Sequence, residues 1–251
     1  MRALSRFYAR QQFDPGLPGI WLNPFYFARK GLVRHLRRLS PHIRGRTLDV
    51  GCGQKPYAAI FPCSDYVGME LDTEDNRRNK KADVFYDGTT FPFPDSAFDS
   101  VVSSQVLEHV RQPVPFLREI RRVLKPGGAF LLTVPFVWDE HEVPFDYTRY
   151  TSFGIRHLLT TNGFDVVEQR KSVNDIRAVF QMKNCFLYSL TVCRRPLVNL
   201  LSCALLMAPV TIAGILASLV LPRVDGLYLD NVILARRPGA PSPDRAAPPS
   251  A

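Results

Sequence analysis

The chain has 251 residues, a formal net charge of +9 and five cysteines. This length is sufficient for one α/β domain with an insertion and a full hydrophobic core, and it argues against a small disulfide-stabilised protein. The cysteines are odd in number and scattered, without a C-x-x-C spacing, so we expect neither a disulfide framework nor a metal site. A reducing cytoplasmic setting fits this cysteine usage.

The first part of the chain, residues 1–45, carries much of the positive charge and is predicted to be a basic helical segment. Leu32, Leu36 and Leu39 recur there at helical spacing. The basic residues around them are Arg29, Lys30, Arg34, Arg37, Arg38, Arg44 and Arg46. Such a helix can be a solvated face docked on the domain, or it can bind an anionic membrane surface or nucleic acid.

Helical and alternating apolar patterns follow one another in the order typical of an α/β domain. We expect helices at 24–39, near 55–61, at 113–123 and at about 152–161. We expect strands at 46–50, 65–70, 83–86, 98–103, 129–135, 164–168 and 227–234. Residues 46–236 therefore form the predicted main domain. The Pro-, Ala- and Ser-rich tail, residues 237–251, is predicted to be disordered.

The most informative segment joins the first strand to a turn that contains Gly51 and Gly53. Two glycines let the backbone approach a ligand closely, and a glycine turn after a strand is typical of a nucleotide-type binding crevice. The second strand ends in Glu70, a carboxylate placed to accept both ribose hydroxyls of an adenosine. Pro56 stands where a dinucleotide fingerprint would have a third glycine, so NAD binding is disfavoured. Taken alone, the glycine segment is explained equally well as an ordinary tight turn without a ligand.

Four segments carry a resemblance to a known family. They are LDVGCG at 48–53, FDSVVSS at 98–104, QVLEHV at 105–110 and LKPGG at 124–128. These motifs, and the order in which they follow one another, resemble those of the class I S-adenosylmethionine (SAM)-dependent methyltransferases. The resemblance implies a Rossmann-like, seven-stranded, mostly parallel α/β sheet of order 3-2-1-4-5-7-6, flanked by helices. Its last strand would be antiparallel and lie between the fifth and the sixth. The implied cofactor is S-adenosyl-L-methionine.

The resemblance also implies where the cofactor binds. The implied residues are Asp49, Gly51, Cys52, Gly53, Glu70, Asp87, Gly88, Thr89, Ser104 and Gln105. The glycine turn would pass close to the methionine part of SAM, and Glu70 would bind the ribose. Asp49 would orient the methionine part or receive its amino group through water. Asp87 would accept the exocyclic amine of adenine, and the loop after the fourth strand would lie beneath the methionine. Without the resemblance, Asp87 and Gln105 are equally well explained as turn residues.

Methyl transfer from a sulfonium is an in-line displacement, so the protein mainly supplies alignment and electrostatics. A hydroxyl acceptor also needs a base, which a histidine can provide, whereas a carboxylate acceptor does not. We favour His141, which follows the fifth strand and lies near Asp146 and Tyr147, two side chains suited to a polar substrate. His109 is the second candidate, and a structural hydrogen bond is its alternative role. Residues 141–151 resemble a subgroup linked to glycan or lipid biosynthesis.

An insertion at about 174–224 separates the last two strands, and its central part, 197–221, contains no charged residue. A run of about 25 residues is long enough to cross a bilayer. The two strands belong to one sheet, however, and Arg194 and Arg223 at the ends of the run favour the cytoplasmic side for both. Pro209 is predicted to break the run into two short helices. We therefore expect a re-entrant or in-plane helical hairpin beside the active site, with a buried soluble cap as the alternative.

These observations predict a SAM-dependent methyltransferase that acts on a small-molecule acceptor: a lipid, a quinone or a lipid-linked saccharide. The membrane surface is an expected partner, at the inner, cytoplasmic face. A nucleic-acid methyltransferase is the second interpretation, suggested by the charge. Against it, residues 103–106 read SSQV rather than the Asn-Pro-Pro-aromatic motif of base amino-methylases, so no nucleic-acid partner is expected. The third interpretation is a non-catalytic SAM-binding, membrane-associated protein.

Overall fold

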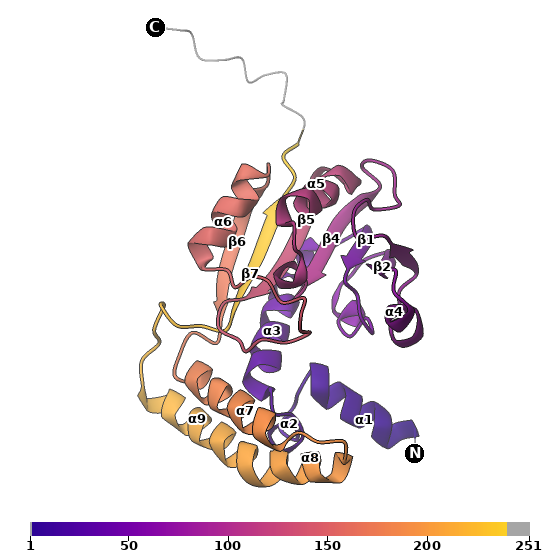
Figure 1. Cartoon of the computed structure of the whole chain (residues 1–251). Helices are drawn as coiled ribbons and strands as arrows, with labels where there is room; N and C mark the ends of the chain where they lie inside the picture. Colours follow the sequence, from indigo (N-terminus) through magenta and orange to yellow (C-terminus); the bar gives the residue numbers. More distant parts are fainter. Residues whose placement is uncertain (1, 240–251) are drawn as a thin grey trace, which may run out of the picture.

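The computed structural model describes residues 2–239, which form a seven-stranded sheet with helices on both faces (Figure 1). The strands are β1 (Arg46–Val50), β2 (Asp65–Leu71), β3 (Val84–Tyr86), β4 (Phe98–Ser104), β5 (Leu124–Pro135), β6 (Asp165–Ser172) and β7 (Asp230–Arg236). Their order is β3-β2-β1-β4-β5-β7-β6. Neighbouring strands pair in parallel, except that β7 is antiparallel to β5 and to β6. The predicted fold class and strand order are confirmed.

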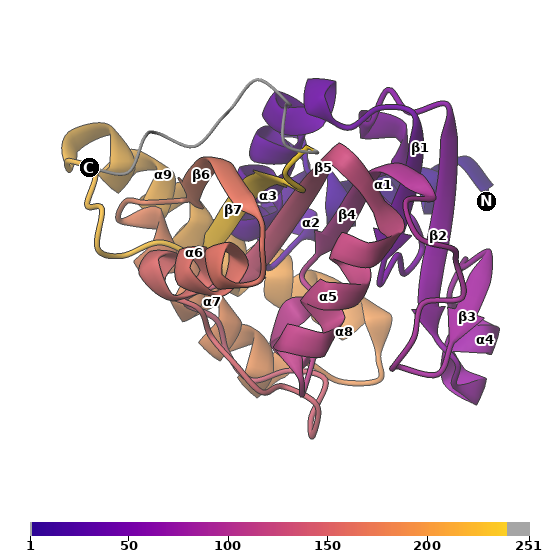
Figure 2. The same cartoon turned by 90° about the horizontal axis from the view of Figure 1, so that it is seen from above.

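Helices cover both faces of the sheet (Figure 2). They are α5 (Pro113–Val123) and α6 (Ser152–Thr161) on one face and α3 (Tyr26–Leu39) on the other. Leu117 and Ile120 of α5 are buried in the core of their face, because apolar residues at helical spacing form one stripe. Leu32 and Leu36 of α3 are buried in the same way on the opposite face, together with Leu131 of β5. The basic N-terminal helix is thus anchored in the hydrophobic core.

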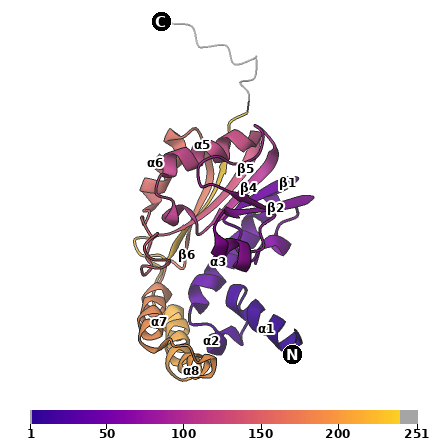
Figure 3. The same ribbon diagram turned by 45° about the vertical axis from the view of Figure 1, so that its right-hand side comes forward.

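Five further helices form a helical layer beyond the carboxyl ends of the parallel strands (Figures 1 and 3). Its members are α1 (Arg2–Phe13), α2 (Gly19–Leu22), α7 (Arg177–Thr191), α8 (Pro196–Ser202) and α9 (Ala208–Val220). α7 and α9 pack against each other, and α2 also contacts α9. Because ligands of α/β sheets bind at the carboxyl ends of the strands, this layer lies at the functional edge of the fold.

The hydrophobic insertion is a helical hairpin, but its turn is not at Pro209. α7 ends before residues 192–195, and Pro196–Val220 then continues as one helix back toward the sheet. A π-helical turn at Cys203–Met207 precedes the proline, and the N–H of Ala208 donates to the carbonyl of Cys203. This wider turn accommodates a residue that has no N–H of its own to donate. The prediction of two short helices broken at Pro209 is therefore wrong.

Two smaller differences concern the segments beside the glycine turn. The helix expected near 55–61 is only a 3-10 turn at Ala58–Ile60. Lys55 there has a positive φ of 54°, which is incompatible with a regular helix, and a proline follows it. A short helix that the sequence analysis did not predict, α4 (Glu74–Asn79), begins where the side chain of Thr73 accepts the N–H of Asn76. The predicted disordered tail lies, from residue 240 onward, outside the described residues.

Candidate functional site

The turn after β1 contains two glycines, and a different structural feature explains each of them. Both have positive φ, 73° at Gly51 and 54° at Gly53. A Cβ at Gly51 would lie 2.4 Å from the Cγ2 atom of Val106, so packing requires glycine there. A Cβ at Gly53 would meet no atom of residues 2–239 within 4 Å, so no contact within this part of the chain explains that glycine. The open space over Gly53 is where a ligand can approach the backbone.

Glu70, at the end of β2, is held against this turn. Its side chain is buried, and its Oε1 atom accepts the N–H of Gly53 at 2.6 Å. This bond fixes the carboxylate beside the glycine turn and leaves its second oxygen to accept hydroxyls of a ligand. The structure thus brings together the two elements, the turn and the acid, that the sequence analysis assigned to one adenosine.

Asp49 lies at the end of β1, is buried, and accepts the hydroxyl of Tyr66 at 2.7 Å. Burial raises the pKa of Asp49 to about 7, and the bond from Tyr66 opposes this shift. A cationic group of a ligand beside Asp49 would favour its ionised form. Cys52 is also buried, and its burial together with the neighbouring carboxylates raises the pKa of its thiol to about 12. Cys52 therefore contributes packing rather than a reactive thiolate.

Asp87, Gly88 and Thr89 follow β3 and are exposed. The Oδ1 atom of Asp87 accepts the backbone N–H groups of Thr89 at 2.8 Å and of Thr90 at 3.1 Å. These bonds, with the Thr89 side chain, hold the pKa of Asp87 below its usual value. The carboxylate is a turn-forming group whose Oδ2 atom can still accept an amine at the edge of the site.

Ser104 ends β4, Gln105 follows it, and both are hydrogen-bonded to the neighbouring strand β5. The hydroxyls of Ser104 and Thr133 lie 2.9 Å apart, and the Nε2 atom of Gln105 donates to the same Thr133 hydroxyl at 3.2 Å. Gln105 has a positive φ of 58°, and its backbone N–H donates to the Thr133 carbonyl. These contacts fix the shape of the loop beside the glycine turn.

The residues present fit SAM. The open space over Gly53, the buried carboxylate of Glu70 against the turn, and the acids Asp49 and Asp87 at the ends of β1 and β3 supply the acceptors that an adenosine and an amino group require. β3, β2, β1 and β4 are consecutive neighbours in the sheet, so their carboxyl ends form one continuous groove edge. No metal is needed for these contacts.

His141, the favoured base, is positioned by a buried carboxylate. Its backbone N–H donates to the Oδ2 atom of Asp146 at 3.0 Å, and its ring Nδ1 atom lies 3.3 Å from the same oxygen. Arg149 donates to the other oxygen of Asp146 at 2.6 Å and holds the pKa of this carboxyl at about 2. Nδ1 also lies 3.2 Å from the carbonyl oxygen of Asp139. Acceptors around Nδ1 favour a proton there, so Nε2 keeps a lone pair for a substrate hydroxyl.

The second candidate, His109, lies beside His141, with their rings 4.7 Å apart and nearly perpendicular. Its Nδ1 atom faces the carbonyl oxygen of Phe145 at 3.0 Å. Sequence spacing alone does not reveal this contact between the loops after β4 and β5. Tyr147, the third predicted catalytic residue, is 45% exposed, and its backbone N–H donates to the carbonyl of Glu108. The predicted histidines and Tyr147 are thus grouped around one loop.

Glu108 was missed by the sequence analysis as a functional residue. It is fully buried, and neither of its carboxylate oxygens has a hydrogen-bond partner among the described residues. Burial raises the pKa of Glu108 to about 8. Glu108, His109 and His141 each offer one atom suited to a divalent cation, and these atoms lie within 4.8 Å of one another. We expected no metal site, so this grouping of three donors is a finding of the structure.

Asp230, at the start of β7, is a second acid that the sequence analysis missed. It is buried, its Oδ2 atom has no hydrogen-bond partner among the described residues, and burial raises its pKa to about 7. Its negative charge adds to the rise in the pKa of Glu108. The sequence could have indicated Asp230, because an antiparallel strand begins at the sheet edge where the parallel strands end. A carboxylate at the start of β7 therefore belongs to the functional edge.

Residues 48–132 match the family model described as "Methyltransferase domain". A "Probable S-adenosylmethionine-dependent methyltransferase" of Mycolicibacterium smegmatis is 29% identical over 164 residues, which cover 60% of this chain and 63% of that protein. An "Uncharacterized methyltransferase" of Mycobacterium leprae is 37% identical over 103 residues, 38% of each chain. The chain thus spans less than two thirds of these relatives' length.

Solved structures share the fold. The (4+2)-cyclase SpnF has a TM-score of 0.54 at 20% identity, covering 83% of this chain and 80% of that chain. The phosphoethanolamine N-methyltransferase 2 of Haemonchus contortus, solved with S-adenosyl-L-methionine, has a TM-score of 0.52 at 20% identity, covering 88% of this chain and 56% of that chain. At such identity the likeness concerns the fold alone, since one fold hosts different reactions.

Proposed function

We propose that this chain, which belongs to the class I SAM-dependent methyltransferase family, transfers the methyl group of SAM to an acceptor held at a membrane surface. The acceptor classes that fit are a lipid, a quinone and a lipid-linked saccharide. The proposal places the protein at the cytoplasmic face of the membrane. It is supported by the residues at the carboxyl edge of the sheet and by the helical layer beside them.

The exposed apolar surface of the helical layer carries the membrane part of the proposal. Its exposed apolar side chains are Leu4, Phe7, Tyr8, Trp21, Phe186, Leu190, Leu197, Leu201, Leu205, Leu216, Leu219 and Val220. We call this surface the apolar face. These side chains are 42–84% exposed, as expected of helices that lie with one side in the bilayer interface.

By length and composition, the helix Pro196–Val220 is long and apolar enough to cross a membrane. Only 28% of its most apolar stretch of 18 residues is buried. A core helix of a soluble protein passes the same test but is mostly buried. A full crossing would separate β6 from β7, which pair along their whole length on either side of the insertion. Association in the plane of the membrane, with α7 and α9 partly immersed, keeps that pairing intact.

The residues around His141 supply the chemistry of the acceptor side. SAM provides the methyl group and the leaving group, so the chain has to bind, orient and deprotonate the acceptor. The Nε2 atom of His141 can accept the proton of a hydroxyl, while Asp146 and Arg149 hold the ring in place.

The loop of His141 follows β5, which only β4 separates from β1 and its glycine turn. Trp138 of this loop contacts Phe25, and Phe25 contacts Tyr188 of α7, so the loop also adjoins the helical layer. An acceptor that rises from the bilayer can therefore reach this loop.

Two measurements test the proposal. Calorimetry on the purified protein should show binding of SAM or of its demethylated product. An untargeted mass comparison of lipids and glycans should show that a strain lacking the protein has lost one species and gained its counterpart lighter by one CH₂. Identical extracts from the two strains would contradict the acceptor classes named above, and labelling of RNA or DNA from isotopic SAM would favour the nucleic-acid alternative.

A further inference from the structure

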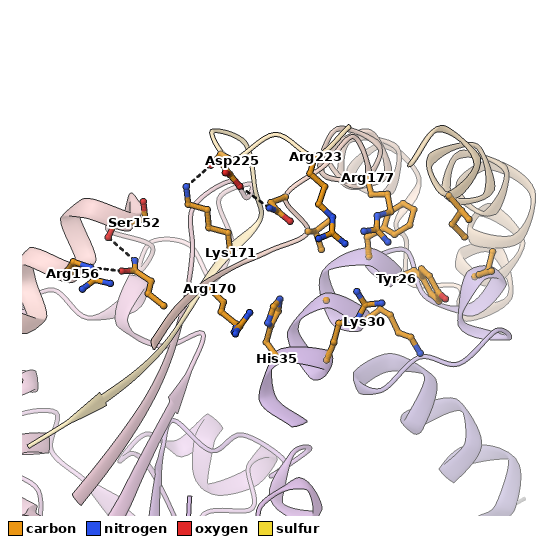
Figure 4. Close-up of a pocket in the computed structure, with 18 of the residues that line it drawn as sticks. Tyr26, Lys30, His35, Ser152, Arg156, Arg170, Lys171, Arg177, Arg223 and Asp225 are labelled. Carbon is orange, nitrogen blue, oxygen red and sulfur yellow. Dashed lines mark hydrogen bonds between the residues drawn. The ribbon is translucent and has the colours of Figure 1, made fainter. Parts of the chain in front are cut away.

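A second site lies at the far end of the same sheet edge. It is a cavity of about 840 Å³ at the carboxyl end of the edge strand β6, bounded by α3, α6, α7, α9 and the segment before β7 (Figure 4). The glycine turn lies four strands away, at the end of β1. With about 4.8 Å between neighbouring strands, the two sites are separated by about 19 Å. We call this cavity the basic pocket.

The charge of its lining distinguishes the basic pocket. Seven lysines and arginines line it, against one acid, Asp225. They come from five separate segments of the chain, namely α3, α6, β6, α7 and the segment before β7, so no single basic helix accounts for them. Figure 4 shows Lys30 and His35 on α3, Arg170 and Lys171 on β6, and Arg177 and Arg223 arranged around one open space. Holding like charges together around a cavity is costly unless an anion joins them.

Part of this charge is already neutralised. Arg170 is paired with Glu168, and Arg177 donates to Asp175 at 2.8 Å. The other basic residues of the lining, Lys30, Arg34, Arg156, Lys171 and Arg223, have no carboxylate within salt-bridge distance among residues 2–239.

Several of these five groups are instead held by neutral oxygens. Lys30 donates to the carbonyl of Pro15 at 2.9 Å, Lys171 to the carbonyl of Asp225 at 2.6 Å, and Arg156 to the side chain of Gln169 at 3.0 Å. Such contacts orient a cation without cancelling its charge. The net positive charge of the cavity therefore persists in the folded protein.

Two further features add to the positive potential. α6 and α7 both begin at the pocket, and the N-terminus of a helix carries a partial positive charge. The ring of His35, whose Nδ1 atom has no partner among the described residues, also faces it. Burial, reinforced by Arg170 and Arg34, lowers the pKa of His35 to about 4. The pocket thus resists the addition of one more positive charge, as expected of a site prepared for an anion.

The remaining wall of the pocket is apolar. It includes Leu17, Ile20 and Ile215 from the helical layer. Leu17 is 75% exposed at the rim. A ligand with an anionic group in the pocket and a hydrocarbon part along this wall would match both kinds of surface.

From this arrangement we propose that the basic pocket binds the phosphate or diphosphate group of the methyl acceptor; this identification of the acceptor rests on the function proposed above. Arg34 and Arg223, which have no carboxylate partner in the described part of the chain, hold the anion together with Lys30 and Lys171. The loop of His141 follows β5, two strands from β6, so the methylated atom lies about 10 Å or more from the phosphate. The acceptor thus carries a spacer, such as a saccharide, between the two.

Binding of inorganic pyrophosphate to the purified full chain is the first test. We expect the variant Arg34→Gln with Arg223→Gln to bind it about tenfold more weakly or worse, because two charge-assisted contacts are lost. The matched control, Arg44→Gln with Arg118→Gln, removes two exposed charges elsewhere and should bind like the wild type. Thermal unfolding verifies that both variants are folded. Equal affinities of the two variants would overturn the proposal.

Vesicles distinguish the sources of the phosphate. Phosphatidylcholine vesicles containing phosphatidic acid should bind the wild type more tightly than pure phosphatidylcholine vesicles, and pyrophosphate should abolish the difference. The Arg34→Gln, Arg223→Gln variant should lose only this difference. If pyrophosphate binds but phosphatidic acid adds nothing, the pocket is supported and its ligand is a soluble phosphate. An equal loss of the difference in the control variant would assign it to surface charge and contradict the pocket.

The outcome is separable from that of the proposed methyl transfer. Calorimetry with SAM reports on the glycine turn alone, about 19 Å from the pocket. Pyrophosphate binding that depends on Arg34 and Arg223, in a protein that does not bind SAM, would sustain the anion site and contradict the proposed function. SAM binding without pyrophosphate binding would contradict the anion site and leave the proposed function standing.

Discussion

The cofactor half and the acceptor half of the sheet edge are built in different ways. The cofactor half, from β3 to β4, uses backbone turns and single acids at strand ends, such as Glu70 against Gly53. The acceptor half, from β5 to β6, uses side chains from loops and helices far apart in the sequence, such as Arg170 and Arg223 in the basic pocket. In our proposal, one half holds a ligand with a fixed shape, and the other combines a base, an anion pocket and an apolar face. A division of this kind lets a single cofactor groove serve different acceptors.

The largest expected effect concerns His141 in the acceptor half. His141→Ala should lower turnover on the acceptor by about 10²–10⁴-fold, because it removes the proposed general base, while SAM affinity stays unchanged. Turnover with isotopic SAM and calorimetry measure the two quantities separately. His157→Ala, a substitution on the exposed surface of α6, is the matched control. Unchanged turnover of the His141 variant would exclude the base role.

The apolar face should provide most of the membrane affinity. Replacing Leu205, Leu216 and Leu219 together by glutamine should weaken binding to phosphatidylcholine vesicles by about 10²-fold or more, since each leucine buries apolar area in the bilayer. These side chains are 59–76% exposed, so the fold should tolerate the change. Val167→Gln, on an exposed position of β6, is the control in the same sedimentation assay. Vesicle binding that survives the triple substitution would contradict the apolar face as the source of the membrane affinity.

Glu70 tests the cofactor half. Glu70→Ala should weaken SAM binding by about 1–3 kcal/mol, or roughly 5- to 150-fold, because a buried charged hydrogen-bond partner is lost. Glu70→Gln should lose less, since the amide oxygen can still accept the N–H of Gly53. Glu74→Ala, an exposed acid on α4, should bind SAM like the wild type. Equal affinity in all variants, measured by calorimetry, would contradict the ribose assignment.

The smallest expected effect is a pH dependence of stability caused by Glu108. Its pKa is raised from 4.5 to about 8 in the folded protein, so between these values the folded state holds a proton that the unfolded state has released. The free energy of unfolding therefore falls as pH rises through this window. Glu108→Gln cannot lose a proton and should be more stable than the wild type by about 1–3 kcal/mol at pH 8, with no such gain near pH 4.5.

Denaturant unfolding at several pH values measures this difference. Glu74→Gln, which replaces an acid on the protein surface, should follow the wild type at every pH. A constant difference between wild type and Glu108→Gln at all pH values would show that Glu108 is ionised in the folded state.

The cofactor half was the more predictable part, for a physical reason. Strand periodicity and the turn with Gly51 and Gly53 are local signals, and they located β1, β2 and β4 within a residue or two. The burial of Glu108 and the contact between His109 and His141 depend on how two loops pack, which no local pattern encodes.

The hydrophobic insertion could be predicted in part. Its extent followed from composition, since Leu197 to Leu221 contains no charge. The position of its turn did not follow from composition. A π-helical turn accommodates Pro209 within one helix, and the chain reverses at 192–195 instead. The basic pocket was not foreseen either, because its cations are dispersed from Lys30 to Arg223. Only the antiparallel return of β7 beside β6 brings these segments together.

The most direct test of the central claim is transfer of an isotopically labelled methyl group. Purified protein, labelled SAM and membranes from a strain that lacks the protein are incubated together, and the lipid extract is analysed. We predict that the label enters one lipid-soluble species with the wild type and not with His141→Ala, although both proteins bind SAM. Label confined to water-soluble products or to nucleic acid, or no transfer by a wild type that binds SAM, would contradict the account.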